Sequence, residues 1–168
     1  MNCACIANPT FAFDPKALDF IPQSFWTNAI APFSSLVTDF FRKKNNPRCR
    51  FHYKLYNALK MSSVFPYIAQ VVGVEWISDY ILLVYKNRFA KLLGISTIEG
   101  CLFHKQGNFS AYGFVSPDPK EVITVLGEEK YYNFDYVNEK LLVHKDRKFH
   151  RNCFEKDIED CKWVKSNR

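Results

Sequence analysis

The sequence predicts a single small α+β domain, from two observations on the 168-residue chain. Hydrophobic residues make up 48% of the chain and aromatic residues 17%, which is enough for one well-packed core. Segments with helical spacing of apolar residues alternate with short β-branched and aromatic runs that favour strands. No apolar run is long enough to cross a bilayer, and no basic region precedes the first apolar residues, so neither a membrane span nor a signal peptide is expected.

The first third of the chain predicts an arm followed by two helices. Four prolines within residues 1–32 indicate an extended arm packed on the domain. Residues 34–44 show helical spacing that "NNPR" interrupts. Residues 51–63 predict an amphipathic helix with Phe51, Leu55 and Leu59 on one face.

The middle of the chain predicts two strands and two helices. Residues 76–78 and 80–85 favour strands joined by a "SD" turn, and residues 86–94 favour a helix that ends at Gly94. Ser96 with Glu99 three residues later has the form of a capping box before an apolar run. The stretch "GCLFHKQGNF" is therefore expected to be helical, with an end or kink near Gly107.

The last third predicts a strand pair and a basic end. Residues 121–137, "EVITVLGEEKYYNFDYV", are interpreted as two strands around a turn, and residues 144–168 as a short helix with a basic tail. Three helices beside a small antiparallel sheet are typical of a winged helix, which we assign to residues 33–143. In that arrangement the capped helix enters the major groove of DNA.

The positive charge is concentrated in one part of the chain. The net charge is +6, yet residues 42–74 carry seven Lys or Arg and no acid, whereas residues 121–143 carry a net −3. A basic patch attracts polyanions and supplies phosphate contacts. A solvated surface loop, or a nuclear localisation signal in "RKKNNPRCR", would give the same composition.

Several short motifs carry a resemblance to a known family. The segments "KLYNAL", "VEWISD", "RFAKLLGI", "LFHKQGNF" and "YGF", within about residues 48–116, resemble the initiator-binding domain of trichomonad transcription factors. The same order is more distantly similar to the heat-shock-factor domain. The resemblance implies a winged helix that binds a short core-promoter element as double-stranded DNA, acts in the nucleus, has the transcription machinery as a further partner, and needs no cofactor.

Candidate DNA-binding residues follow from side-chain chemistry. Lys105 is suited to guanine, Gln106 to adenine, Asn108 to either a base or phosphate, and His104 to a base edge or the backbone. The expected phosphate contacts are Arg48, Arg50, Lys54, Lys86 and Arg88. The alternative for His104 and Asn108 is a surface histidine and a helix cap, and for each cation an ordinary solvated side chain.

Two other functions are compatible with parts of the sequence. Winged helices also serve as protein docking modules in transcription complexes, although such a module has no need for a basic stretch beside a reading helix. Asp118, Glu128 and Lys130 have the spacing of a Mg²⁺-dependent nuclease, a reading that requires Glu128 and Lys130 on one strand.

The cysteines predict reduced thiols rather than a metal centre. Cys3 and Cys5 are separated by one residue, and no pair has CxxC spacing. The alternative is a metal site formed by His144, His150, Cys153 and Cys161.

Overall fold

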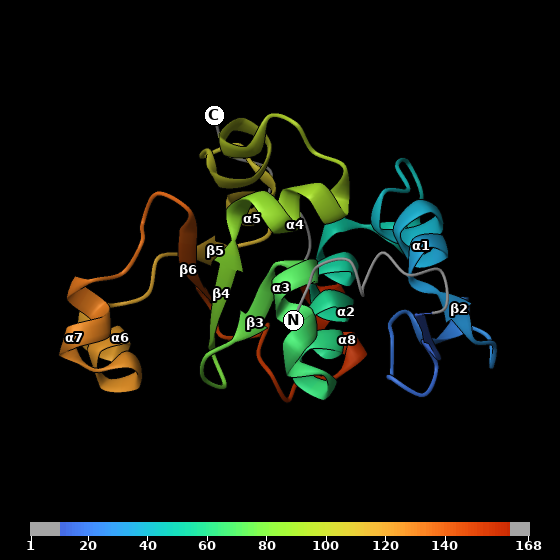
Figure 1. Ribbon diagram of the computed structural model, residues 1–168, viewed down its shortest axis with the longest axis horizontal. Coiled ribbons are helices and arrows are strands. Elements are labelled where there is room, and N and C mark those ends of the chain that lie inside the picture. Colours follow the sequence, from blue (N-terminus) through green and yellow to red (C-terminus); the bar gives the residue numbers. More distant parts are fainter. Residues whose placement is uncertain (1–10, 162–168) are drawn as a thin grey trace.

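A four-stranded antiparallel sheet lies at the centre of the computed structural model, which describes residues 11–161. The strand order is β3–β4–β6–β5, with every neighbouring pair antiparallel. Figure 1 shows the helices of the main body on one side of the sheet and a separate helical hairpin at the other end. The strands are β3 (Val74–Trp76), β4 (Ile81–Tyr85), β5 (Phe114–Val115) and β6 (Glu139–His144).

The inner face of the sheet is covered by helices that the sequence largely predicts. The central helix α2 spans Phe51–Val64, and its residues Leu55, Leu59 and Met61 are fully buried. The helix predicted over residues 86–94 is α4 (Lys86–Leu93), which ends at Gly94 with a left-handed φ of 69°. Shorter helices complete this layer: η4 (Pro47–Cys49), η5 (Pro66–Ile68), α3 (Ala69–Val72), the π-helical turn η6 (Glu99–Phe103) and α5 (Asn108–Ala111).

The N-terminal segment contributes to the same core. Strands β1 (Ala12–Phe13) and β2 (Ala31–Pro32) pair with one another, and η2 (Gln23–Phe25) lies between them. Helix α1 (Phe33–Leu36) runs directly into the π-helical η3 (Val37–Phe41). On α2, Asn57 accepts the N–H of Ile21 at 2.9 Å and donates to its carbonyl at 2.8 Å, which ties this segment to the domain. The domain boundaries at 32 and 143 stay a prediction, and residues 1–10, with Cys3 and Cys5, lie outside the described range.

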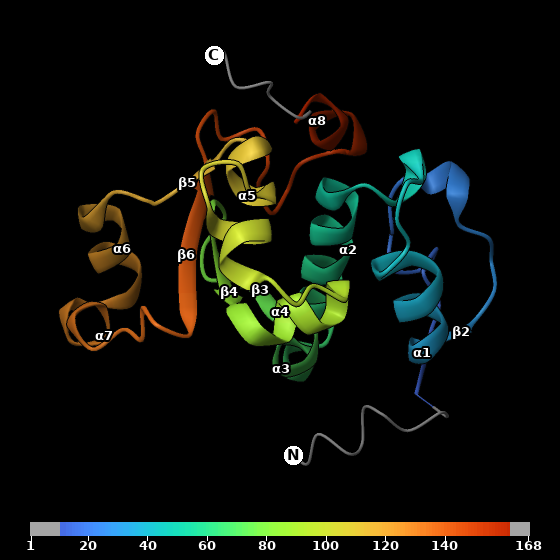
Figure 2. The same cartoon turned by 90° about the horizontal axis from the view of Figure 1, so that it is seen from above.

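Strand β4 is buried on both of its faces because side chains alternate along a strand. Leu82 and Val84 point into the main core with the inner helices. Ile81 and Leu83 point the other way, into a second cluster with Val122 of the hairpin. Both faces of the sheet are therefore covered by helices. Figures 1 and 2 both show α6 and α7 on one side of the sheet and the remaining helices on the other.

The strand pair predicted over residues 121–137 is wrong, because this segment forms two helices, α6 (Pro119–Leu126) and α7 (Glu128–Tyr132). Asp118 caps α6 by accepting the N–H of Lys120 at 2.8 Å, and Pro119 occupies the first turn. Val122 and Leu126 are four residues apart, so a helix places both against the sheet. The β-branched residues suggested strands, but burial against the sheet outweighs their weak intrinsic preference.

The C-terminal region closes the fold. His144 belongs to β6 rather than to a tail, and helix α8 (Glu155–Asp160) packs near α2, with Ile158 and the following Cys161 buried in the main core. Residues 162–168 of the expected basic tail lie outside the described range. Between residues 11 and 161, no helix has the length and apolar content to cross a membrane. The predicted α+β class is confirmed, with short helices packed on a small antiparallel sheet in a winged-helix arrangement.

Candidate nucleic-acid interface

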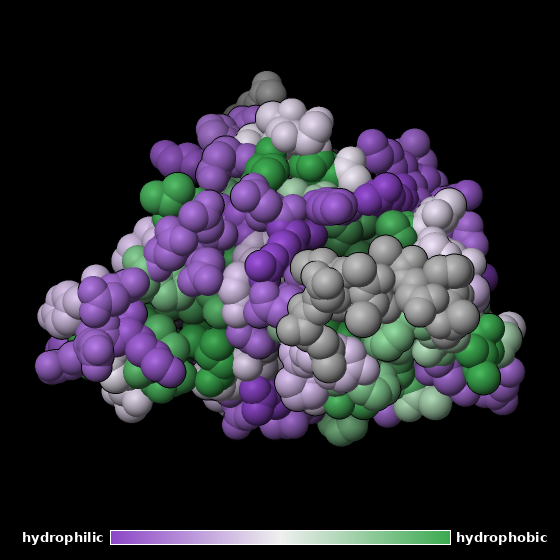
Figure 3. Space-filling model, in the orientation of Figure 1, coloured by the Kyte–Doolittle hydropathy of each residue, from purple (hydrophilic) through white to green (hydrophobic). Residues whose placement is uncertain are grey.

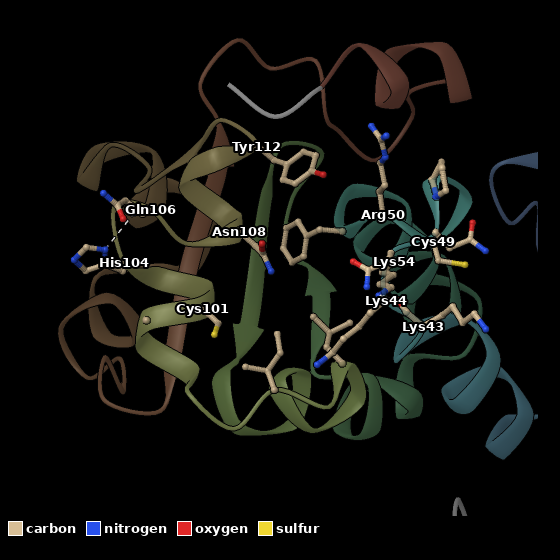
Figure 4. Close-up of a pocket in the computed structure, with 17 residues that line it drawn as sticks. Lys43, Lys44, Cys49, Arg50, Lys54, Cys101, His104, Gln106, Asn108 and Tyr112 are labelled. Carbon is tan, nitrogen blue, oxygen red and sulfur yellow. Dashed lines mark hydrogen bonds between the residues drawn. The ribbon is translucent and has the colours of Figure 1, made fainter. Parts of the chain in front are cut away.

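An open groove of about 1060 Å³ lies between the basic loop before α2 and the segment that joins η6 to α5. Figure 4 shows its two walls, with Lys43, Lys44 and Arg50 on one side and His104, Gln106 and Asn108 on the other. The sequence predicts function for both walls, but only the fold places residues 43–54 opposite residues 100–112.

The basic wall is held in place by some of its own cations. The guanidinium of Arg42 donates from Nη2 to the carbonyl of Lys91 at 2.7 Å, near the C-terminus of α4, where a cation is favoured. The Lys54 ammonium donates to the carbonyl of Lys43 at 2.7 Å. Asn46 accepts the N–H of Arg48 at 2.9 Å and caps η4. These three contacts fix the loop, and burial lowers the pKa of Lys54.

Four other cations of this wall remain available. Lys43, Lys44, Arg48 and Arg50 are exposed, and none of their charged groups has a hydrogen bond or ion pair within residues 11–161. Several like charges on one surface repel one another unless an anion neutralises them. The basic wall therefore presents positive charge that no acidic group within residues 11–161 neutralises.

The opposite wall is shorter than the predicted helix. η6 begins at Glu99 without a side-chain cap, and Glu99 pairs with Lys86 at 3.0 Å, so the capping box predicted from Ser96 is wrong. The element ends at Phe103, and His104 is extended. The break predicted near Gly107 is confirmed, since Gly107 is the N-cap residue of α5.

Close packing defines the turn between η6 and α5. A Cβ atom on Gly107 would lie 2.7 Å from the backbone of Leu102, which only glycine avoids. The backbone N–H of Gln106 donates to His104 Nδ1 at 3.3 Å. His104, Lys105 and Gln106 are consequently exposed side chains on a tight turn.

Buried rings anchor this turn to the core. Phe109 is 1% exposed, and its ring packs edge-on against Phe51 at 5.0 Å and stacks with Phe103 at 5.4 Å between centroids. Leu102 is fully buried as well. The buried apolar residues Leu102 and Phe109 thus belong to the core, and the polar residues His104, Gln106 and Asn108 line the groove.

The predicted site residues are only partly brought together. Arg50, Lys54, His104, Gln106 and Asn108 line the groove, whereas Arg48 and Lys105 do not line it but adjoin residues that do.

Two of the predicted cations have other partners. The Lys86 ammonium contacts Glu99 and lies 5.2 Å from the centre of the Phe103 ring. Arg88 donates to Gln70 and lies over the Tyr85 ring at 5.4 Å, in a polar hollow of about 570 Å³ that Asp135 and Glu139 also line. Neither residue lines the groove.

Sequence reasoning did not single out some groove residues. Lys43 and Lys44 were visible only as part of the basic run, and Tyr112 only as part of "YGF". The ring of Tyr112 stacks with His52 at 4.8 Å between centroids. His52 is 2% exposed, and within residues 11–161 its Nδ1 has no hydrogen-bond partner. Burial, and then Arg50, lower the pKa of His52 from 6.5 to about 4, so its ring is neutral near pH 7.

The arrangements that the nuclease and the metal site require are not formed within residues 11–161. Glu128 and Lys130 lie on helix α7 rather than on a strand, and the Asp118 carboxylate caps α6. Cys153 and Cys161 are buried thiols. His144 Nδ1 accepts backbone N–H groups from Asp146 at 3.3 Å and Lys148 at 3.4 Å, and residues 11–161 contain no group of metal-ligating side chains.

Comparisons with known proteins bear on the family of this chain. A search of curated proteins found no match. A solved structure similar to this chain is the initiator-binding domain of T. vaginalis IBP39 bound to the alpha-SCS Inr element; the identity is 19%, the TM-score is 0.45, and the match covers 71% of this chain and 95% of that one. Residues 24–143 match the family model described as the transcription-initiator DNA-binding domain IBD. That match spans both walls of the groove and most of the chain, and the chain therefore belongs to the initiator-binding domain family.

Proposed function

We propose that this protein binds a promoter initiator element in the nucleus as double-stranded DNA, through the groove between residues 43–54 and 100–112, and acts by binding rather than as an enzyme. The observation that carries the proposal is the set of four unpaired cations, Lys43, Lys44, Arg48 and Arg50, beside a wall of exposed amide and imidazole groups. The description of the family supports the same function.

The two walls have different tasks in this proposal. The four cations contact phosphate oxygens, which sets affinity and orientation without selecting a sequence. Gln106 and Asn108 offer amides that pair with adenine, and Lys105 and His104 offer donors for guanine or the backbone. Because these residues lie on a tight turn and at the first position of the short helix α5, they contact a short element.

Two cations that the sequence suggested as DNA contacts are excluded from the proposed interface. Lys86 supports η6 through Glu99, and Arg88 faces the polar hollow at Asp135 and Glu139. Lys54 contributes by holding the loop, since its ammonium already donates to Lys43.

The test is fluorescence anisotropy with an initiator duplex and a randomised duplex pool. Gln106→Ala with Asn108→Ala is expected to reduce the preference for the initiator duplex by about tenfold or more, since one bidentate base contact contributes about 1–3 kcal/mol of discrimination. Arg50→Ala is expected to weaken both duplexes equally, and Arg88→Ala is the matched control that leaves both unchanged. If Arg88→Ala weakens binding as much as Arg50→Ala, or if the wild type binds no duplex, the groove is not the interface.

A further inference from the structure

The hairpin of α6 and α7, with the turn that follows it to residue 137, has a surface opposite in character to the groove. Ten large hydrophobic side chains are exposed within residues 11–161, and five of them lie between residues 115 and 137. Tyr132 is 74% exposed, Tyr136 56% and Val137 80%. At the left end of Figure 3, hydrophilic and hydrophobic side chains share this end of the molecule.

The aromatic residues of the hairpin form one connected cluster. The rings of Tyr131 and Tyr132 meet edge-on at 5.1 Å, and those of Phe134 and Tyr136 at 4.8 Å between centroids. Tyr131 and Phe134, one ring from each pair, pack against the same buried cluster, so the two pairs lie on one part of the surface. Tyr131 and Phe134 pack inward against the sheet, while Tyr132 and Tyr136 face solvent.

The turn that presents Tyr136 and Val137 is ordered by hydrogen bonds. Asp135 accepts the N–H groups of Val137 and Asn138, each at 3.2 Å, and the Asn138 amide at 2.9 Å. The bonds from Asn138 lower the pKa of Asp135. Exposed rings on an ordered turn lose little entropy on binding, which makes them effective anchors for a partner.

Acidic side chains lie beside the cluster and form no ion pair in the described part of the chain. Glu128, Glu129 and Asp135 are exposed and form no ion pair within residues 11–161, and Lys130 is the one cation of α7. Such a surface repels DNA phosphate and attracts a basic segment.

The hairpin surface also stays accessible while the groove is occupied. None of residues 114–144 lines the groove. In Figures 1 and 2, α6 and α7 lie at the end of the molecule opposite α1. A partner on the hairpin and a DNA duplex in the groove would therefore not compete.

We propose that the hairpin surface formed by Glu128, Glu129, Tyr132, Asp135, Tyr136 and Val137 docks a protein segment in which lysine or arginine flanks an apolar anchor. The charge of the surface selects the basic residues, and the exposed rings receive the anchor. This inference concerns a second surface and does not depend on DNA binding at the groove.

The experiment pans a library of short random peptides on the full chain, with and without a bound duplex, and maps the enriched peptides by amide chemical shifts. We expect enriched peptides to combine lysine or arginine with aromatic or aliphatic residues, and to shift amides of residues 128–137 in both states. Tyr132→Ser with Tyr136→Ser, and separately Glu128→Lys with Glu129→Lys, are expected to weaken these peptides by about tenfold or more. The matched control is Glu159→Lys with Asp160→Lys on α8, which makes the same charge change elsewhere and leaves peptide binding unchanged.

Several results would overturn the proposal. The proposal is wrong if panning enriches no peptides or enriches peptides without lysine or arginine. It is also wrong if the peptides shift amides outside residues 128–137, or if the hairpin variants bind them as tightly as the wild type. Self-association in sedimentation experiments that the same variants abolish would identify a second copy of this chain as the occupant instead. Failure of duplex binding with intact peptide binding would reject the proposed function and leave this inference standing.

Discussion

The groove and the hairpin are both built from short elements, but they hold their charges in different ways. In the groove, Arg42 and Lys54 satisfy backbone carbonyls and fix a loop whose remaining cations face solvent. In the hairpin, apolar residues pack on the sheet, and Arg147 fastens α6 through a two-bond contact with Glu121 at 2.9 and 3.0 Å. The net charge of +6 is therefore the sum over a basic groove and an acidic hairpin surface. The first suits DNA phosphate, and the second suits a basic protein segment.

The largest effect is expected from removing the buried ring of Phe109, which holds the turn between η6 and α5 against the core. Phe109→Ala is expected to destabilise the protein by about 3–5 kcal/mol, because a fully buried ring leaves a cavity among Phe51, Phe89 and Phe114. Urea unfolding measures the loss. Phe109→Leu keeps most of the apolar volume and should recover a large part of the lost stability; equal losses for the two variants would show that the cavity is not the cause.

A smaller effect is expected at the turn itself. Gly107→Ala forces the backbone of Leu102 to move and should cost roughly 1–3 kcal/mol. It should also reduce discrimination between duplexes, since His104 and Gln106 would move with the turn. Gly127→Ala in the hairpin is the comparison variant: its φ of 86° strains any side chain, nothing lies within 4 Å, and duplex binding should stay at the wild-type level. A loss of discrimination in Gly127→Ala alone would reverse the assignment of the two regions.

The stability of the protein is expected to decrease in acid because of a histidine buried near the groove. The pKa of His52 is lower in the folded protein than in the unfolded chain, so between about pH 6.5 and pH 4 the unfolded state binds more protons. Stability is therefore complete above about pH 6.5 and falls with decreasing pH, by at most about 1.4 kcal/mol per pH unit for one group. Burial lowers the pKa of His144 too, with the same sign.

Chemical denaturation at several pH values measures this slope. His52→Gln should flatten the profile between pH 6.5 and 4, because the substituted side chain does not titrate. A profile with the same slope in His52→Gln would mean that His52 is not responsible for acid sensitivity.

The smallest effect is expected at the attachment of the hairpin. Arg147→Gln removes the contact with Glu121, and because both side chains are partly exposed the cost should be about 0.2–1 kcal/mol. Hydrogen exchange should quicken in α6 and remain unchanged in α5. Faster exchange in both helices would show that the two regions are coupled rather than independent.

The inner half of the fold could be predicted because its local signals agree with its packing. The apolar face of α2, the β-branched residues of β4 and Gly94 after α4 each indicate the element that forms. Residues 121–137 give conflicting signals: β-branched residues favour strands, while Asp118-Pro119 just before them is typical of a helix start.

The chemical character of the site could be predicted from the sequence, but the residues that line it could not. The basic run predicts one wall of the groove, and "HKQGN" predicts the other. The partners of Lys86, Arg88 and Glu99 could not be predicted, because they depend on contacts between segments that are distant in the sequence. Which lysine supports the loop and which faces the groove is likewise a matter of tertiary contact, since Lys54 and Lys43 look alike in the sequence.

The central claim is that cations of the groove, rather than the overall positive charge, bind DNA. The most direct measurement is the salt dependence of duplex affinity for Lys43→Ala with Lys44→Ala, compared with Lys120→Ala with Lys130→Ala, which removes the same charge from the hairpin. Each lost phosphate contact should reduce the slope of log affinity against log salt by about 0.9. For the groove variant we predict a slope reduced by the amount expected for roughly two lost phosphate contacts, and for the hairpin variant an unchanged slope. Equal slopes for the two variants would show that the groove cations do not bind the DNA.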